Sequence, residues 1–407
     1  MTPPSRRLLV VADADSYVKW GITRALEAAT AWDVEVVVVR SAVTPTREQI
    51  AAAADGRLAR LPEVIAYRDL LNRLSRCAPD ALLLACRGPL IELLMRDAFG
   101  RPGARPVTAA GLPGIWMPPT DLGLRLRCSI DLMVVHSERE REAVRSHAGP
   151  KPRTVALASL VADTTRDQAH APANAEPAHR RLIFAPQALV PQAVADRRAI
   201  VEALADVARE HPELDVVIKV RGDKSDPQTH RDSDPYQEIL AALGQGAPHN
   251  LTIGHGALSR WLPGAIGLVT VNSTAALEAV ASRVPALCLE EFAEEAGRIT
   301  TGFEASGLHG SFDDLRALRL RMPDPQWAPA NYLHDPERDN WLEELDALVG
   351  AVRAEGSPGV QAPRGWRQRI NAWRHRRQAL GANDVWWARA LGNGAAALVA
   401  YGLVNER

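Results

Sequence analysis

Several common signatures are missing from this sequence of 407 residues. Its four cysteines show no CxxC spacing, and no group of His, Cys and carboxylate residues has the spacing of metal ligands. Neither GxGxxG nor the P-loop pattern GxxxxGKS/T occurs. The interpretations as an NAD-binding enzyme or a P-loop ATPase therefore lack their main sequence evidence. We therefore expect buried thiols in a reducing compartment, no disulfide or zinc framework, and a site that uses no metal and no cofactor.

Excess charge and long apolar segments are missing as well. The net charge of −1 gives the whole protein no general attraction to nucleic acid or to an anionic membrane. No signal-peptide core follows Arg6 and Arg7, and the uncharged stretch from Ala390 to Val404 is short and rich in Ala and Gly. We therefore expect a cytoplasmic protein with no transmembrane span and no nucleic-acid partner.

What the sequence does contain is a repeated alternation of short apolar runs and longer helical patterns, which is typical of β-α-β units in a parallel sheet. The chain exceeds the size at which one hydrophobic core stops growing, so two domains are expected. The predicted strands of the first series are Leu8–Ala12, Val34–Val39, Ala81–Ala85, Val107–Ala110, Leu132–His136 and Val155–Ala158. Those of the second series are Leu182–Pro186, Val216–Val220, Leu251–Gly254, Leu268–Val271 and Ala286–Leu289, with a helix over Arg197–His211.

The predicted fold is therefore α/β, with two doubly wound, Rossmann-like domains that face a central cleft. Residues 1–161 form the first domain, 162–179 a linker, 180–350 the second domain and 351–407 a helical C-terminal segment. Ligands of such sheets bind at the carboxyl ends of the strands, so the residues that follow each strand are the candidates for function.

The strongest candidates of the second domain are Asn272, Ser273 and Thr274, which stand between an apolar strand and an alanine-rich helical pattern that contains Glu278. The unpaired N–H groups and the dipole of a helix start favour a phosphate there. An ordinary helix cap by Ser273 or Thr274 is the alternative. The sequence leaves both interpretations open.

Two basic residues, Lys219 and Arg221, share a face at the end of another strand of the second domain. A lysine in an apolar strand is costly unless an anion meets it, and that anion is either an acid such as Glu278 or a diphosphate or acidic sugar. Arg221 offers a bidentate fork to such a group. His230 follows in a polar loop, where it either contacts a phosphate, transfers a proton or is simply solvated.

In the first domain, Asp13 and Asp15 follow the first strand and share one face if the chain stays extended. Two carboxylates would then stand at the lip of the cleft, with Asp15 as the preferred general base and Asp13 as the second choice. The alternative is that one of them caps the next helix and the other is solvated. Ser16 and Lys19 continue the same segment and are assigned to the acceptor side of the cleft.

Two loops are expected to line the cleft. The first, residues 111–120, holds two glycines and three prolines, and its candidates for ligand contact are Gly111, Pro113 and Gly114. Such a composition predicts a rigid loop with an exposed backbone. In the second domain, Gln187 follows the first strand and is the corresponding polar contact.

The C-terminal segment stands apart from both domains. No Asp or Glu occurs between Gly356 and Asn383, a stretch with six arginines. Trp366, Ile370 and Trp373 form an aromatic stripe at helical spacing. Such a helix can lie in a membrane interface beside anionic lipid, or it can dock its stripe on the protein, and the sequence does not decide between the two.

In this order the segments resemble a bacterial family of predicted glycosyltransferases of unknown specificity. The matching segments are Ala12–Trp20, Gly111–Gly114, His136–Glu140, Phe184–Gln187, Lys219–Gly222, Thr229–His230 and Asn272–Glu278. More distantly, Ser273 to Glu278 with Pro285 is similar to the donor-binding motif of capsular polysaccharide transferases, which include Kdo and sialyl transferases that use CMP-sugars. Those enzymes often carry a His-Pro pair at the strand end where Lys219 stands here, so the donor stays open.

The resemblance implies a GT-B fold, with the acceptor in the first half, a nucleotide sugar in the second half and no metal in catalysis. The predicted function is an inverting glycosyltransferase of surface-polysaccharide or glycoconjugate synthesis. It would take a CMP- or UDP-sugar donor and a glycan or lipid-linked acceptor, with peripheral contact to the inner face of the cell membrane as one interpretation of the tail. The alternatives are a nucleotide-sugar 2-epimerase, a CDP-polyol phosphotransferase of the same fold, and a non-catalytic nucleotide-sugar-binding protein.

Overall fold

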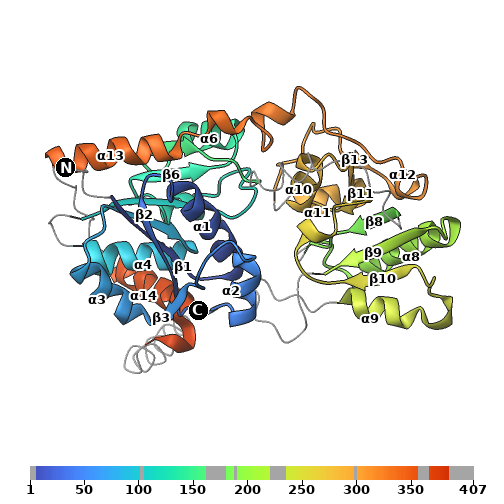
Figure 1. Ribbon diagram of the computed structural model, residues 1–407, viewed down its shortest axis with the longest axis horizontal. Helices are drawn as coiled ribbons and strands as arrows, with labels where there is room; N and C mark the ends of the chain where they lie inside the picture. Colours follow the sequence, from blue (N-terminus) through green and yellow to red (C-terminus); the bar gives the residue numbers. More distant parts are fainter. Residues whose placement is uncertain are drawn as a thin grey trace, which may run out of the picture.

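The computed structural model describes residues 6–100, 105–161, 180–187, 190–220, 235–297, 300–355 and 366–384. Figure 1 shows two α/β halves, each built around its own parallel sheet. Hydrophobic clusters cover both faces of each sheet. The prediction of two Rossmann-like, doubly wound halves is therefore confirmed.

The first half contains a seven-stranded sheet in the order β3-β2-β1-β4-β5-β6-β7. Its strands are β1 (Arg7–Ala12), β2 (Asp33–Val39), β3 (Glu63–Ile65), β4 (Ala81–Ala85), β5 (Val107–Gly111), β6 (Leu132–Val135) and β7 (Thr154–Leu157). The helices between them are α1 (Asp15–Ala28), α2 (Arg47–Ala54), α3 (Tyr67–Arg76), α4 (Gly88–Phe99), α5 (Asp121–Arg125) and α6 (Glu138–Ser146).

The second half contains a six-stranded sheet in the order β10-β9-β8-β11-β12-β13. Its strands are β8 (Arg180–Phe184), β9 (Leu214–Lys219), β10 (Leu251–Gly254), β11 (Ala265–Thr270), β12 (Ala286–Leu289) and β13 (His309–Gly310). Its helices are α8 (Val194–Glu210), α9 (Pro235–Ala242), α10 (Ala275–Ala281), α11 (Ala293–Gly297) and α12 (Phe312–Arg316), and α13 (Trp341–Glu355) and α14 (Trp366–Leu380) follow. Short 3-10 turns are η1 (Gly244–Gly246), η2 (Leu258–Arg260), η3 (Glu290–Phe292), η4 (Ala328–Ala330), η5 (Pro336–Arg338) and η6 (Gly381–Asn383).

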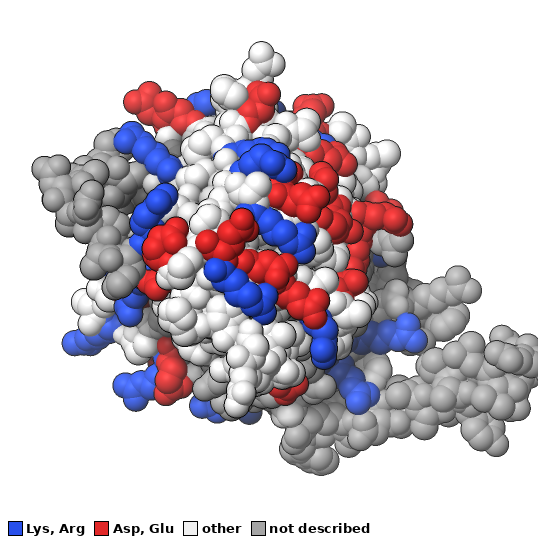
Figure 2. Space-filling model, turned by 90° about the vertical axis from the view of Figure 1, so that its right-hand side faces the viewer, with Lys and Arg blue, Asp and Glu red and all other residues white. Residues whose placement is uncertain are grey.

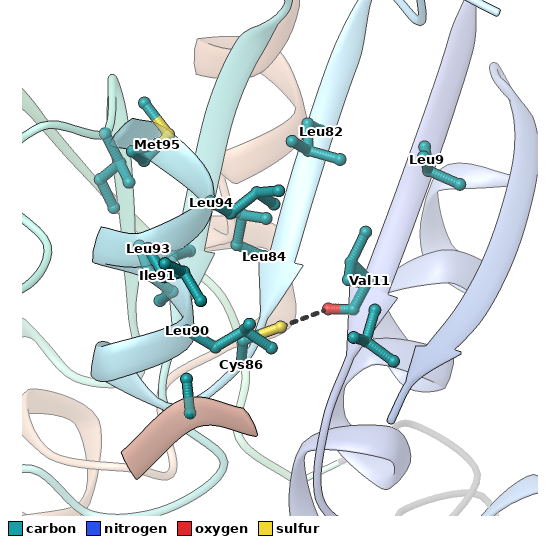
Figure 3. Close-up of a cluster of buried hydrophobic side chains, with 14 of the residues drawn as sticks. Leu9, Val11, Leu82, Leu84, Cys86, Leu90, Ile91, Leu93, Leu94 and Met95 are labelled. Carbon is teal, nitrogen blue, oxygen red and sulfur yellow. Dashed lines mark hydrogen bonds between the residues drawn. The ribbon is translucent and has the colours of Figure 1, made fainter. Parts of the chain in front are cut away.

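Strand β4 shows why the sheets form buried layers. All five of its residues are buried, as expected for a parallel strand with helices on both faces. Leu82 and Leu84 belong to one hydrophobic cluster and Leu83 to the cluster on the opposite face, because successive side chains of a strand alternate. In Figure 3, Leu82 and Leu84 lie between α4 and β1, and the Cys86 thiol donates to Val11 O at 3.1 Å.

The strands predicted from the sequence agree with the structure in number and order, with two exceptions. Each of the eleven predicted strands overlaps an observed strand, with ends that agree within three residues. The exceptions are β3 and β13, which contain only three and two residues. Such short edge strands carry too little alternation to be distinguished from a loop.

The last helices of the chain return to the first half. Trp341, Leu345 and Val349 of α13 belong to the hydrophobic core of the first half, and the Trp341 indole donates to Glu27 Oε2 at 3.0 Å. In Figure 1, α13 runs along the top of the first half, beside α6. The predicted boundary of the second domain at residue 350 thus falls within a helix that packs on the first half.

Helix α14 also packs on the first half, against α4. Leu380 is buried in the core of that half, His375 bonds Glu92, and Arg376 pairs with Asp97 at 3.2 Å. Trp373 is half-buried beneath Arg377, whereas the side chains of Trp366 and Ile370 lie outside the described residues. Docking on the protein is the interpretation of the tail that these contacts favour.

The surface and the thiols bear on two further expectations. All four cysteines are free, but Cys77 and Cys128 are exposed, so the prediction of four buried thiols is wrong for this pair. Figure 2 shows side chains of both charges interspersed on one face of the second half. In the same half, Asp206 pairs with Arg209 and Arg316. None of the described helices combines the length and the hydropathy that a bilayer crossing requires.

Candidate functional site

The two halves meet at the loop that follows β5. Thr301 N, in the second half, donates to Met117 O at 2.7 Å. Ile115 packs against the hydrophobic core of the second half. A Cβ added to Gly302, in the second half, would lie 2.4 Å from Ile115 Cγ2. The predicted cleft loop therefore reaches across the carboxyl edge of the first sheet to the second half.

A second contact joins α1 to α10 across the same junction. Lys19 Nζ donates to Glu278 Oε1 at 3.3 Å. Asp15 stands four residues before Lys19 on α1, so the two lie on the same face of that helix. A Cβ added to Gly114 would lie 3.7 Å from Thr274 Cγ2. The structure thus brings together five of the residues selected from the sequence: Asp15, Lys19 and Gly114 from the first half, and Thr274 and Glu278 from the second half.

Asp13 has a different environment from Asp15. Its carboxylate is fully buried and accepts hydrogen bonds from Arg87 N at 3.0 Å and Arg87 Nε at 2.9 Å, at the start of α4. Burial raises the pKa of Asp13, and the Arg87 charge opposes this shift. The expected extended segment with both carboxylates on one face does not form, because α1 already begins at Asp15.

Gly111 shows how the end of β5 fits against α1. A Cβ at this position would lie 2.4 Å from Trp20 Cζ2 and 2.9 Å from Val134 O, so only glycine permits the approach. The Trp20 indole donates to His136 Nε2 at 2.9 Å, and His136 Nδ1 lies 2.7 Å from Ala158 O. Burial lowers the pKa of His136 to about 4, so the ring is neutral at pH 7. Gly111 therefore helps to position α1. Ser16, on α1, and Pro113, in the loop after β5, are half-buried.

In the second half, β11 ends at the three polar residues singled out in the sequence. Asn272 Nδ2 donates to Thr300 O at 3.0 Å. Ser273 Oγ accepts from Ala275 N at 3.3 Å, whereas the Thr274 side chain makes no cap hydrogen bond. Helix α10 has only seven residues, which limits its dipole. Ser273 Oγ thus accepts from one N–H group at the helix start, whereas Thr274, the N-cap residue, does not, and the phosphate interpretation stays a prediction.

The basic residues of the second half are described only in part. Lys219 is half-buried at the end of β9. Arg221 and His230 lie outside the described residues. Gln187 follows β8 and is half-buried, with its Oε1 atom inaccessible to solvent. Among the residues that the structure does describe, no group of His, Cys, Asp and Glu side chains could hold a metal ion.

Glu140 is a residue of the junction whose contacts the sequence did not reveal. Its buried carboxylate accepts from Trp116 N at 2.7 Å, from His136 N at 2.8 Å and from the Tyr332 hydroxyl at 2.7 Å. Burial raises the pKa of Glu140, and the three donors oppose this shift. Since Tyr332 belongs to the core of the second half, Glu140 ties that half to the β5 loop. A partner 192 residues away along the chain leaves no local signal in the sequence.

Several solved structures are similar to most of the chain. One is a putative UDP-N-acetylglucosamine 2-epimerase from Listeria monocytogenes, with a TM-score of 0.56 and 10% identity over 88% of this chain and 99% of that one. The S. aureus MnaA–UDP co-structure has a TM-score of 0.56 and 11% identity over 88% and 100%. The UDP-GlcNAc 2-epimerase from Neisseria meningitidis bound to UDP-GlcNAc has 0.55 and 11% over 86% and 100%. At such identities the likeness concerns the fold, which is GT-B-like, as predicted.

The sequence itself gives a more specific match. No curated protein matches the chain. A family model, in contrast, matches residues 8–348, which cover both sheets and the junction between them. The protein therefore belongs to the family described as "Putative glycosyltransferase (DUF6716)".

Proposed function

We propose that this protein is an inverting, metal-independent glycosyltransferase that uses a nucleotide-sugar donor in surface-polysaccharide or glycoconjugate synthesis. The observation that carries the proposal is the junction at which Lys19 of α1, one helical turn after Asp15, pairs with Glu278 of α10. A carboxylate from the first half thus stands opposite the strand ends at which a doubly wound second half would bind its ligand.

The second half would hold the donor. Its phosphate would lie near Ser273 and Thr274, with Lys219 and Arg221 supplying the positive charge that stabilises the leaving group. Two similar folds were solved with UDP and with UDP-GlcNAc, which supports a nucleotide-containing ligand for this protein. These side chains would neutralise the charge on the leaving nucleotide, so a metal ion is not needed for this role.

The first half would bind the acceptor and activate it. In a single displacement, the acceptor oxygen bonds to the anomeric carbon as the bond to the phosphate oxygen of the nucleotide breaks, and the acceptor proton passes to a base. Asp15 is our assignment for that base, because it lies on the α1 face that meets α10, whereas the Asp13 carboxylate is held by Arg87. One displacement inverts the anomeric configuration.

The proposal is tested by Asp15→Asn, with Asp33→Asn as the matched control on an exposed residue at the opposite edge of the sheet. Calorimetry against CMP-, UDP-, GDP- and TDP-sugars first identifies the donor. We expect Asp15→Asn to keep the donor affinity while lowering the rate of nucleotide release by about 100-fold or more, as for loss of a general base. Near-wild-type turnover of Asp15→Asn would remove Asp15 from the catalytic role.

A second candidate function is supported by the solved structures alone. The similar folds named above include 2-epimerases, in which a UDP-sugar is the substrate. An epimerase would convert the nucleotide sugar to its isomer with no acceptor present. The two functions therefore differ in whether the nucleotide is released.

A further inference from the structure

The end of α14 contacts the carboxyl edge of the first sheet, where the candidate site begins. Ala379 O, near the end of this helix, accepts hydrogen bonds from Ala42 N at 2.9 Å and from Arg87 Nη2 at 3.3 Å. Ala42 belongs to the loop after β2, and Arg87 follows β4 at the start of α4. Because β1 lies between β2 and β4, the last helix of the chain bonds the loops that follow both neighbours of β1.

The short turn η6, directly after α14, adds a side-chain contact to the same edge. Asn383 Nδ2 donates to Ser41 O at 2.7 Å, in the loop after β2. Gly381 has a φ of +55°, and a Cβ at this position would lie 2.9 Å from Ala42 Cβ. Glycine therefore permits both the turn at the end of α14 and the close approach of η6 to this loop.

The two loops that α14 and η6 contact hold the same residue, Asp13, which follows β1. Ser41 Oγ donates to Asp13 O at 2.7 Å. Arg87 donates to both carboxylate oxygens of Asp13, from N at 3.0 Å and from Nε at 2.9 Å. Ser41 and Asp13 are buried, so a hydrogen bond lost between them is costly. Hydrogen bonds thus link the end of α14 to Asp13 along two routes, through Ser41 and through Arg87.

Asp13 in turn determines where α1 begins. Only Ala14 separates it from Asp15, the first residue of α1, and Ala14, the N-cap residue, offers no side-chain cap. The position of the proposed base thus depends on how the main chain of Asp13 is held. We infer that α14 and η6 support the acceptor side of the site and that Asn383 is a positioning residue, which fixes the segment from Asp13 to Asp15; this inference rests on the proposed function.

The test uses Asn383→Ala, which removes the donor to Ser41 O, and Asn383→Gln, which keeps an amide donor on a longer side chain. Asn371→Ala is the matched control, because Asn371 is exposed on α14 itself. Two quantities are measured on the full-length chain. Hydrogen–deuterium exchange, read by mass spectrometry, follows the amides of residues 13–18. Turnover of the nucleotide sugar that binds, with a glycan extract as the source of acceptor, gives kcat and the donor KM.

We expect Asn383→Ala to speed exchange at residues 13–18 by about tenfold, as for one lost hydrogen bond, while peptides from β11 and β12 exchange as in the wild type. The kcat should fall by about threefold to tenfold and the donor KM should stay within about twofold, because the displaced group is the base and not the donor site. Asn383→Gln should recover part of both losses. Asn371→Ala should match the wild type.

Unchanged exchange at residues 13–18 in Asn383→Ala overturns the inference, because α14 and η6 would then not hold this segment. Faster exchange with an unchanged kcat overturns it as well, since the contact would then serve stability alone. If the wild type releases no nucleotide from any donor, the proposed function itself fails. The exchange measurement distinguishes that result, because it reports whether Asn383 holds the segment without any turnover.

Discussion

Replacing Tyr332 by phenylalanine tests the tie between the two halves. The Tyr332 hydroxyl donates to Glu140 Oε1 at 2.7 Å, and both residues are 1% exposed. The variant keeps the aromatic ring and its packing, so the loss is confined to the contacts of the hydroxyl, chiefly the hydrogen bond to the buried Glu140 carboxylate beside a weaker one with Ser137. Such a bond contributes about 1.5–3 kcal/mol to the free energy of unfolding, and we expect a loss of that size.

The effect should depend on pH in a defined direction. Because burial raises the pKa of Glu140 above its usual 4.5, proton uptake by Glu140 favours the folded state below the unfolded pKa, and this contribution is lost as the pH rises through the folded pKa. The Tyr332 hydroxyl stabilises mainly the ionised carboxylate. Tyr332→Phe should therefore raise the pKa of Glu140 further and cost more stability at pH 8 than at pH 5.

Urea unfolding at both pH values, followed by tryptophan fluorescence and by circular dichroism, measures this difference. A double-mutant cycle with Glu140→Gln supplies the control, since Tyr332→Phe should cost about 1 kcal/mol and show no pH dependence once the charge is gone. An equal cost at both pH values and in both backgrounds would refute the claim that Tyr332 acts on the ionised Glu140.

Two further substitutions examine how the first half is packed. Gly111→Ala would put a methyl group 2.4 Å from Trp20, so we expect the free energy of unfolding, measured in urea, to fall by about 1–3 kcal/mol. The control is Gly350→Ala on α13, where the methyl group meets open space and the effect should be neutral or slightly stabilising. Equal effects of the two variants would contradict the close approach of Trp20 to Gly111. Trp341→Ala removes a side chain that is 2% exposed, so we expect the free energy of unfolding to fall by about 3–5 kcal/mol and proteolysis within α13 to become faster. An unchanged unfolding curve would show that α13 is not part of the core.

Most of the fold could be predicted because its strands are buried on both faces. Runs such as Leu8–Ala12 and Ala81–Ala85 are continuously apolar, and that pattern with intervening helices is specific for a parallel sheet. The return of α13 and α14 to the first half could not be predicted. An amphipathic pattern shows which face of a helix is buried but not which partner covers it.

The candidate site could be predicted for residues whose place in the fold follows from their position just after a strand. Asp15, Gly114 and Thr274 follow strand ends, and parallel strands gather their ends at one edge of the sheet. The pairing of Asp13 with Arg87 depends on a contact across 74 residues, for which the sequence has no local signal. The contact between Glu140 and Tyr332, which lie 192 residues apart, likewise has no local signal in the sequence.

The central claim is that Asp15 supports sugar transfer from a nucleotide donor. The most direct test is to incubate wild type and Asp15→Asn with the nucleotide sugar that binds, with and without a glycan extract, and to follow the donor by NMR in the presence of a chelator. We predict that wild type releases free nucleotide, faster with the extract, and that Asp15→Asn does not. Conversion of the donor into an isomeric nucleotide sugar, with no free nucleotide and no need for the extract, would contradict the account.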